Sequence, residues 1–393
     1  MNFDPSPAAE SLRTEVRAFL AEHFGPEVEA RTHESGQLHD WGLHRAFADK
    51  GWIRATLPKE MGGEGRSAEE IAIVASEFDR IRAPYDGLGI ALALAPVIHE
   101  CGTDFHRETI IPELLNGESL ICMGYSEPGS GSDVAACTTR AVPVDGDPKN
   151  GWRIDGQKMW TSLAELSKWV ILLTRTNPDV AKHRGLTFFL VPMDTPGIEI
   201  QEVRTLGGKR TNATYFDDVR IGDEWRLGEV DGGWRVMTTA LAYERGVIGG
   251  VYDCVRLLKE TTDWAENSQR PDGSRVIDDP SVRERLVRTA IDTEVAQLLG
   301  LRAVWKATTG AKPGLEGSCA KLFATEAYTR ATSYLLDVLG PEGALQYDVP
   351  DAPVEGFLDY CFRNATVSTV AGGTSEIQKN NIAERMLGLP RAR

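Results

Sequence analysis

The sequence predicts a mainly α-helical protein with a central β domain. Short β-rich runs gather between about residues 121 and 228, whereas helical periodicity dominates on both sides of them. The chain has 393 residues, which is enough for two or three domains and a sizeable core. We therefore expect a helical domain over residues 1–120, a β domain over 121–228 and a helical domain over 229–393.

Apolar spacing indicates helices in the first region. Leu12, Val16, Phe19 and Leu20 fall on one helical face. The apolar window GLGIALALAPVI, near residue 90, is too short to span a bilayer and contains a proline. This window predicts a buried helix.

The middle region is a series of short strands. The runs WVILLTRT, LTFFLVPM, IEIQEV and TYFDDVRI are rich in β-branched and aromatic residues. Turn sequences such as VDGDPKNG and DTPG accompany them. Strands this short and closely spaced predict a small β-sandwich or barrel.

The third region returns to long helices. Val287, Ile291, Val295 and Leu298 form one apolar stripe, and the segment from Lys321 to Leu339 forms another. These stripes predict helices that pack on one another.

Charge and composition restrict the function classes. A net charge of −15 disfavours a nucleic-acid-binding surface, although a local basic patch for a phosphorylated ligand is compatible with it. The N-terminal stretch MNFDPSPAAESLRTEV lacks the basic start and apolar segment of a signal peptide. The six cysteines are scattered, with no CxxC pair. We therefore expect a cytoplasmic protein with no membrane span and no metal site.

Two motifs near the β region could contact a ligand. GYSEPGSGSDVAA (residues 124–136) combines glycines, which permit close backbone approach, with short polar side chains that include Ser126 and Ser132. GQKMWTS (156–162) places Trp160 beside the hydroxyls of Thr161 and Ser162, as a stacked ring system requires. By themselves, the first motif is also compatible with a surface turn, and the second with a strand that carries an ordinary packing tryptophan.

A third motif, GWRVMTTALAYERGVIGGVYDCVRLL, places a carboxylate on an apolar stripe. The stripe consists of Val236, Ala240, Val247, Val251, Val255 and Leu258, and Glu244 fills the gap in its spacing. Burial raises the pKa of a carboxyl group towards the range of a general base. A structural ion pair is the alternative, although the adjacent Arg245 points about 100° away on the helix.

The stretch VSTVAGGTSEIQKN (367–380) predicts a helix start after a tight turn. Gly372 and Gly373 allow the turn, and Ser375 with Gln378 forms a capping-box pattern. A helix N-terminus of this kind suits an anion, but it is also compatible with a cap that binds nothing. Glu376 is a second candidate for a catalytic carboxylate.

Together these motifs resemble the acyl-CoA dehydrogenase family over essentially the whole chain. GYSEPGSGSDVAA is similar to the family's first signature, GQKMWTS follows at the expected distance, and AGGTSEIQ…AERMLGLPR resembles its C-terminal helix. The resemblance implies an N-terminal helical domain, a β domain and a C-terminal four-helix bundle, with FAD between the last two. It also implies a homotetramer in which a neighbouring subunit touches each flavin.

The resemblance also implies roles for individual residues. Those that would line the isoalloxazine ring are Tyr125, Ser126, Trp160, Thr161 and Ser162. Ser132 would lie along the pantetheine channel, and Tyr243 and Arg245 would lie near the substrate's CoA chain. Thr374 and Glu376 would face the nucleotide part of the cofactor.

The reaction that the resemblance implies is α,β-desaturation of an acyl-CoA thioester, with a carboxylate removing the α-proton. Many members carry this base immediately before the Gly-Thr of the final motif, where this chain has Gly372. A minority, including isovaleryl-CoA and long-chain dehydrogenases, carry it directly before an arginine, which matches Glu244-Arg245. The backbone N–H of Gly372 is still expected to polarise the thioester carbonyl, and the substrate is expected to be a branched or bulky acyl-CoA.

Two departures concern the contact between subunits. Where many members have an Arg-x-x-Phe-Gly segment that reaches a neighbour's FAD, this chain has Arg270 without the Phe-Gly. Where they often have Gln and a double glycine, it has Asp337-Val-Leu-Gly-Pro-Glu. Both changes are compatible with a heterotetramer that contains a paralogous subunit.

Three hypotheses for the function follow. The first is a dehydrogenase that passes electrons to an electron-transfer flavoprotein. The second is a flavin oxidase or monooxygenase of the same fold, which peroxide formation would distinguish. The third is a non-catalytic subunit of a heteromeric dehydrogenase, which would purify without flavin.

Overall fold

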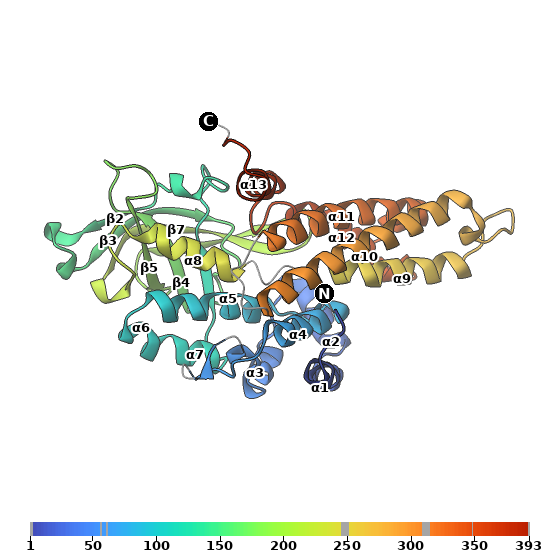
Figure 1. Ribbon diagram of the computed structural model, residues 1–393, viewed down its shortest axis with the longest axis horizontal. Coiled ribbons are helices and arrows are strands. Elements are labelled where there is room, and N and C mark those ends of the chain that lie inside the picture. Colours follow the sequence, from blue (N-terminus) through green and yellow to red (C-terminus); the bar gives the residue numbers. More distant parts are fainter. Residues whose placement is uncertain are drawn as a thin grey trace.

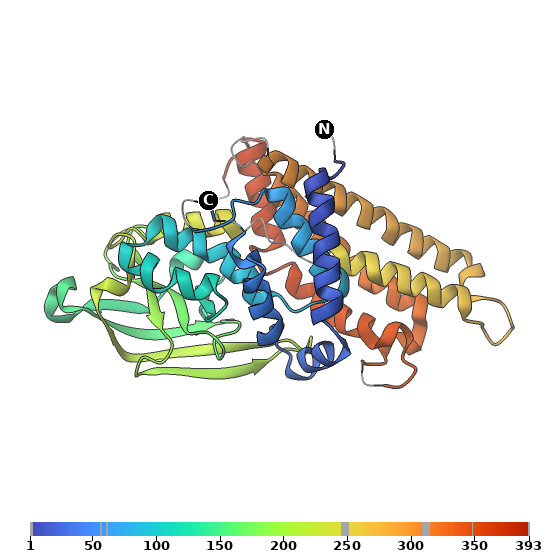
Figure 2. The same ribbon diagram turned by 90° about the horizontal axis from the view of Figure 1, so that it is seen from below.

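The computed structural model describes residues 3–55, 57–59, 62–244, 251–308, 315–347 and 349–391. Along this part of the chain, helices are followed by a sheet and then by helices again, as the sequence predicts. The sheet lies at one end of the molecule and the C-terminal bundle extends to the other, with the first helices near the middle (Figure 1; Figure 2).

The helices before the first strand pack around a common apolar core. Ser6 begins the first of them, because its Oγ accepts the N–H of Ala9 at 3.2 Å and Pro7 fits the first turn. The predicted face of Leu12, Val16, Phe19 and Leu20 is buried. The described helices of this region are α1 Pro7–His23, α2 Pro26–Ser35, α3 Trp41–Asp49, α4 Ala68–Ile81, α5 Asp86–Cys101, α6 Asp104–Thr109 and α7 Ile111–Leu115.

The apolar window near residue 90 lies in α5, and most of its side chains are buried, as predicted. Among the described residues, every helix is too short or too polar to cross a membrane.

The middle region forms one eight-stranded sheet. Its main path runs β6-β7-β3-β2-β4-β5-β8, and β1 pairs with β4 in parallel. The sheet folds over so that apolar residues of β3 and β7 pack on those of β4 and β5, for example Trp152 on Phe189 with ring centroids 5.2 Å apart. The strands are β1 Ile121–Gly124, β2 Arg140–Pro143, β3 Trp152–Met159, β4 Trp169–Arg175, β5 Leu186–Pro192, β6 Ile198–Arg204, β7 Arg210–Ile221 and β8 Arg226–Leu227.

Strands β4 and β5 are buried on both faces. One face joins the core of the sheet, and the other packs against the N-terminal helices. The helices α5, α6 and α7 therefore cover one side of the β domain (Figure 1).

The chain then forms α8 Gly233–Glu244, α9 Val251–Asn267, α10 Pro280–Thr308, α11 Glu316–Leu339, α12 Phe357–Ser368 and α13 Ser375–Asn381. The long helices α9, α10, α11 and α12 lie along one another in a bundle (Figure 2). The Lys321–Leu339 segment is confirmed as a packing helix, with Tyr328, Leu335 and Leu339 in the core. Helix α13 contacts α11 and stands to one side of the bundle (Figure 1).

The predicted stripe on α10 does not face the core. Val287 and Ile291 are 56% and 57% exposed, and Leu298 is also exposed. The helix instead buries a second face that consists of Val282, Leu286, Thr289, Thr293 and Ala296. The spacing correctly predicted the helix but not the face that packs, because α10 carries apolar residues on two sides.

The predicted apolar stripe that includes Glu244 is buried along α8 but not along α9. Val236 and Ala240 are buried, and Glu244 follows Ala240 by four residues as the last residue of α8. On α9, however, Val255 is 38% exposed, and Cys254 and Leu257 occupy the core in its place.

Candidate functional site

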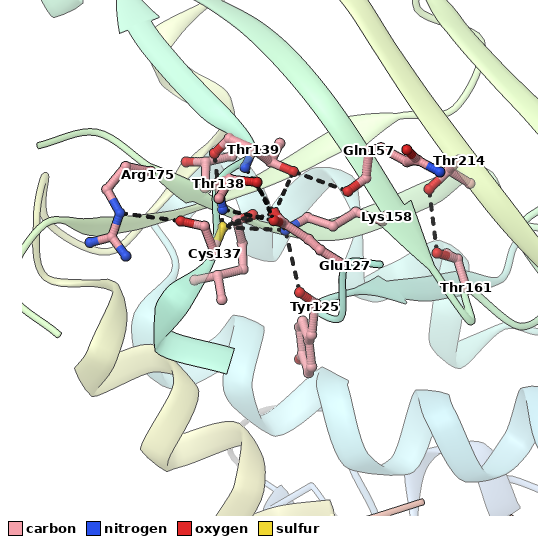
Figure 3. Close-up of polar contacts among 12 residues, drawn as sticks. Tyr125, Glu127, Cys137, Thr138, Thr139, Gln157, Lys158, Thr161, Arg175 and Thr214 are labelled. Atoms are coloured by element: carbon pink, nitrogen blue, oxygen red, sulfur yellow. Dashed lines mark hydrogen bonds and ion pairs between the residues drawn. The ribbon is translucent and has the colours of Figure 1, made fainter. Parts of the chain in front are cut away.

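Hydrogen bonds bring the first two motifs together. The N–H of Met159 donates to the carbonyl oxygen of Ser126 at 2.9 Å. The Nζ of Lys158 approaches the carbonyl oxygen of Tyr125 at 3.3 Å (Figure 3). The segments 124–127 and 156–162, whose first residues are 32 positions apart in the sequence, therefore meet at the end of β3.

The link between the two motifs is a buried ion pair. The carboxylate of Glu127 accepts from Lys158 Nζ at 2.8 Å, and Lys158 is fully buried. The same carboxylate accepts the N–H and hydroxyl of Thr138, at 2.7 and 2.6 Å, and those of Thr139, at 2.8 and 2.6 Å (Figure 3). Glu127 therefore ties the first motif to β3 and to the segment before β2.

Its surroundings keep the Glu127 carboxylate charged. Burial alone would raise the pKa of the Glu127 carboxyl group, but the Lys158 ammonium and the two threonines hold it well below its usual range. Burial raises the pKa of the neighbouring Cys137 thiol to about 11, so the thiol is neutral at physiological pH.

Trp160 stands out from this junction. It directly follows β3, has a positive φ of 65°, and is 57% exposed. A tryptophan in the left-handed region is uncommon and marks a backbone held by its surroundings. The result is a broad apolar surface that the described chain leaves uncovered.

Strand β7 positions Thr161 and Ser162, the two hydroxyl-bearing residues that follow Trp160. The N–H of Thr161 donates to the carbonyl oxygen of Asn212 at 2.9 Å, and the Asn212 side chain donates back to the Thr161 carbonyl at 3.0 Å. The Ser162 hydroxyl lies 3.2 Å from that of Thr211. Tyr125 packs edge-on against Phe188, with ring centroids 5.5 Å apart. The five residues predicted to line a flavin ring thus come from two segments that touch, and an exposed aromatic beside hydroxyls and backbone groups fits a flat heteroaromatic ring.

The AGGTSE segment forms a tight turn before a short helix. Gly372 and Gly373 have φ values of 66° and 91°, as the turn prediction requires. The predicted capping box is wrong by one residue, because Thr374 is the N-cap and its Oγ1 accepts the N–H of Ile377 at 3.2 Å. Gln378 instead donates its side-chain amide to the carbonyl of Gly372 at 3.1 Å. The helix therefore begins one residue earlier than the pattern suggested.

Glu376 is exposed on α13. A hydrogen bond from its own N–H, and one with Thr374, lower the pKa of its carboxyl group. Both properties suit a capping residue better than a general base, whose pKa should lie near the operating pH.

The other predicted residues occupy separate places. Ser132 is exposed on the loop of the first motif. Tyr243 is 43% exposed on α8, and burial together with Glu100 and Cys101 raises the pKa of its phenol. Glu244 ends α8, but its side chain lies outside the described structure, as does Arg245.

Arg270 lies in the segment between α9 and α10. The α9–α10 connection is at the end of the bundle away from the sheet (Figure 1). It forms an ion pair with Asp279, with Nη2 and Oδ2 2.7 Å apart. Asp337, at the other departure, pairs with Arg285 at 3.3 Å. The structure therefore does not bring Arg270 together with the flavin-lining candidates of its own chain.

Sequence reasoning missed three buried charged residues. Glu127 and Lys158 lie inside the quoted motifs but were not singled out. Lys321 is 2% exposed on α11 and donates to the carbonyl oxygen of Gly373 at 2.7 Å. Lys321, between Ala320 and Leu322, could have been found as a charged residue flanked by apolar ones in a segment predicted to pack. Glu127 and Lys158 have no such pair of apolar neighbours.

Family models match the three regions in order. Residues 6–118 match the N-terminal domain of acyl-CoA dehydrogenase, residues 122–219 its middle domain and residues 231–387 its C-terminal domain.

Full-length relatives agree with these matches. The chain is 35% identical to acyl-CoA dehydrogenase FadE26 of Mycobacterium tuberculosis, with 100% of both chains covered. Its fold is similar to that of a chain in the ChsE4-ChsE5 complex of Mycobacterium tuberculosis, with a TM-score of 0.90, 35% identity and complete coverage of both chains. It is also similar to a chain of the Tcur3481-Tcur3483 steroid ACAD, with a TM-score of 0.90, 30% identity and complete coverage.

Proposed function

Because this chain belongs to the acyl-CoA dehydrogenase family, we propose that it desaturates an acyl-CoA thioester between its α and β carbons, leaving a trans-2-enoyl-CoA. The observation that carries the proposal is the hydrogen-bonded junction of the first two motifs, from which Trp160 stands exposed. The enzyme is an oxidoreductase, and its cofactor is FAD.

The junction supports the flavin-binding assignment. Tyr125, Ser126, Trp160, Thr161 and Ser162 would hold the ring system. The Glu127–Lys158 pair keeps the backbone of the first motif in register with the end of β3. FAD bound there would supply the acceptor for the hydride that leaves the β carbon of the substrate. Thr374 and Glu376, at the start of α13, would contact its nucleotide part.

We assign removal of the α-proton to Glu244. It follows the buried Ala240 by one helical turn, and the competing carboxylate, Glu376, is exposed and has a lowered pKa. A positioned base of this kind contributes about 10²–10⁴-fold to the rate. The N–H of Gly372 would polarise the thioester carbonyl, and a fixed donor at such an oxyanion is worth about 3 kcal/mol. Ser132, Tyr243 and Arg245 would lie along the CoA chain.

A branched or bulky acyl group is the substrate we infer. The base position favours it by resemblance, and a relative that is 30% identical over its full length is described as a steroid ACAD. We therefore place polycyclic acyl groups of steroid type ahead of short linear chains. The electron acceptor we propose is an electron-transfer flavoprotein.

We further propose that the chain assembles with a different, related subunit. Arg270 is neutralised by Asp279 of its own chain, and Asp337 places negative charge where the family often has an amide. A second copy of this chain would therefore present a poorer surface for a pyrophosphate. The similar ChsE4-ChsE5 structure is a complex of two different chains.

A panel of acyl-CoA substrates tests the proposed function. Purified protein is mixed with each acyl-CoA under anaerobic conditions, and loss of the oxidised-flavin absorbance is followed together with formation of the enoyl-CoA. Steroid-type acyl-CoAs are expected to bleach the flavin faster than butyryl-CoA. Peroxide formed in stoichiometric amounts in air would indicate an oxidase instead, and protein purified without flavin would indicate a subunit that needs its partner or has no turnover.

A further inference from the structure

The turn at Gly372 and Gly373 rests on a buried ammonium group. Lys321, on α11, is 2% exposed, and its Nζ donates to the carbonyl oxygen of Gly373 at 2.7 Å. Among the described residues, no carboxylate forms an ion pair with it within 4.0 Å. Glu326 and Glu376 act on it only at longer range.

Burying this ammonium group lowers the stability of the fold. Burial lowers the pKa of the Lys321 ammonium, and the carboxylates of Glu326 and Glu376 only partly oppose this effect. A buried ammonium with one backbone partner is far from ideally solvated. Helix α11 therefore carries a group that an apolar side chain could replace if packing were its only role.

The hydrogen bonds fix which way the turn faces. The Gln378 amide donates to the carbonyls of Gly372 and Gly373, at 3.1 and 3.4 Å, from the same helix start. Both carbonyls therefore point towards protein donors, and their peptide bonds are trans. In a trans peptide the N–H points opposite to the carbonyl, so the N–H groups of Gly373 and Thr374 point away from these donors.

The backbone N–H groups on the outward face of the turn have no hydrogen-bond partner in the described chain. Within the described chain, the N–H groups of Gly372, Gly373 and Thr374 form no hydrogen bond. A Cβ added at Gly372 would meet no atom within 4 Å, so this face is open. Two successive glycines have more backbone freedom than any other pair, and such donors need external support to keep one orientation.

We propose that Lys321 is a positioning residue for the reaction: by holding the Gly373 carbonyl, it fixes the conformation of the two-glycine turn and so the direction in which the turn presents the Gly372 N–H to the thioester carbonyl. The proposal rests on the desaturation assigned above. The ammonium also lies at the carbonyl end of the Gly373–Thr374 peptide group, and this polarises the N–H of Thr374. Its contribution is largest where negative charge develops, because preorganised donors act mainly on the transition state.

The test uses the FAD-containing protein and acetoacetyl-CoA as a probe. This thioester has acidic α-protons, and its enolate has a distinct ultraviolet absorbance. The pH at which the bound probe ionises therefore reports how well the site stabilises an enolate, without turnover. The variants are Lys321→Met, which removes the ammonium, and Lys379→Met, which removes an exposed ammonium on α13 that pairs with Glu326 at 3.0 Å.

Lys321→Met is expected to raise the apparent pKa of the bound probe by at least about one unit and to lower kcat by about 10- to 100-fold, with KM changed less than about threefold. Lys379→Met should change neither quantity. If Lys321→Met does not fold, Gln378→Glu replaces a donor to the same turn by an acceptor, and the same direction of change is expected.

An unchanged probe pKa in Lys321→Met, or in Gln378→Glu where that variant has to be used, would overturn the assignment. Equal shifts in Lys321→Met and Lys379→Met would also overturn it, because they would indicate a general effect of charge. A wild-type protein that binds the probe without lowering its pKa would instead contradict the proposed function, and the role of Lys321 with it.

Discussion

Glu127 and Lys158 form an ion pair, with Oε1 and Nζ 2.8 Å apart, in which both side chains are buried. The pair joins the loop of the first motif to the C-terminal end of β3, just before Trp160. It therefore couples the stability of the β domain to the geometry of the site that we assign to flavin.

Breaking this pair from one side should destabilise the protein strongly. Glu127→Gln leaves the Lys158 ammonium buried without its counter-ion, which typically costs about 3–5 kcal/mol. The double variant Glu127→Gln, Lys158→Met should be less destabilised than the sum of the two single variants. Urea unfolding at matched protein concentration measures these differences.

Lys168→Met is the matched control, because Lys168 pairs with Glu113 at 2.7 Å but is mostly exposed. An exposed pair contributes about 0–1 kcal/mol. Additive effects of the two buried substitutions would contradict the coupling.

Trp160 should affect flavin affinity more than folding. Trp160→Ala removes an exposed ring, so the unfolding midpoint of the flavin-free protein should change little. The loss of a stacking surface is expected to weaken FAD binding by about tenfold or more, measured by flavin fluorescence titration. Trp264→Ala is not an equivalent control because that ring packs against the bundle core. Val230→Ala, at an exposed residue just after β8, is suitable. Unchanged FAD affinity in Trp160→Ala would remove Trp160 from the site.

Asp79 should make stability depend on pH between about 4 and 7. Burial and the carboxylates of Asp253 and Asp86 raise the pKa of Asp79 to about 7, opposed by the Tyr85 hydroxyl at 2.7 Å and by Lys209. The folded protein thus binds this proton more tightly than the unfolded chain, whose Asp pKa is about 3.9. The stabilisation from the protonated form is complete below about pH 4 and is lost as pH rises through about 7.

Asp79→Asn keeps an oxygen for Tyr85 and removes the titration. It should be more stable than wild type at pH 8 by about 1–3 kcal/mol, with little difference near pH 4. Unfolding midpoints at the two pH values measure this. The exposed Asp179→Asn serves as control, and a difference of the same size at both pH values would show that Asp79 does not titrate as described.

The sequence allowed the order of regions, the buried α5 and the faces of α1 and α11 to be predicted, because each depends on local periodicity. The outward face of α10 could not be predicted, since Val287 and Ile291 are as apolar as core residues and only their neighbours decide their burial. The cap at Thr374 was shifted by one residue because both Thr374 and Ser375 are good caps.

The same distinction applies to the site. The flavin-lining motifs could be found because their residue types are unusual in combination. Glu127, Lys158 and Lys321 could not be paired with their partners, since those contacts join segments that are far apart in sequence. Their roles depend on tertiary packing, which no local pattern contains.

The most direct test of the central claim is the rate of α-proton removal in Glu244→Gln, compared with Glu376→Gln. Each FAD-containing variant is mixed with an acyl-CoA that wild type desaturates, and flavin bleaching is followed in a stopped-flow instrument. We predict that Glu244→Gln keeps its flavin and loses bleaching by at least about 10³-fold, whereas Glu376→Gln bleaches within about tenfold of wild type. Normal bleaching by Glu244→Gln, or its loss in Glu376→Gln alone with FAD still bound, would contradict the account.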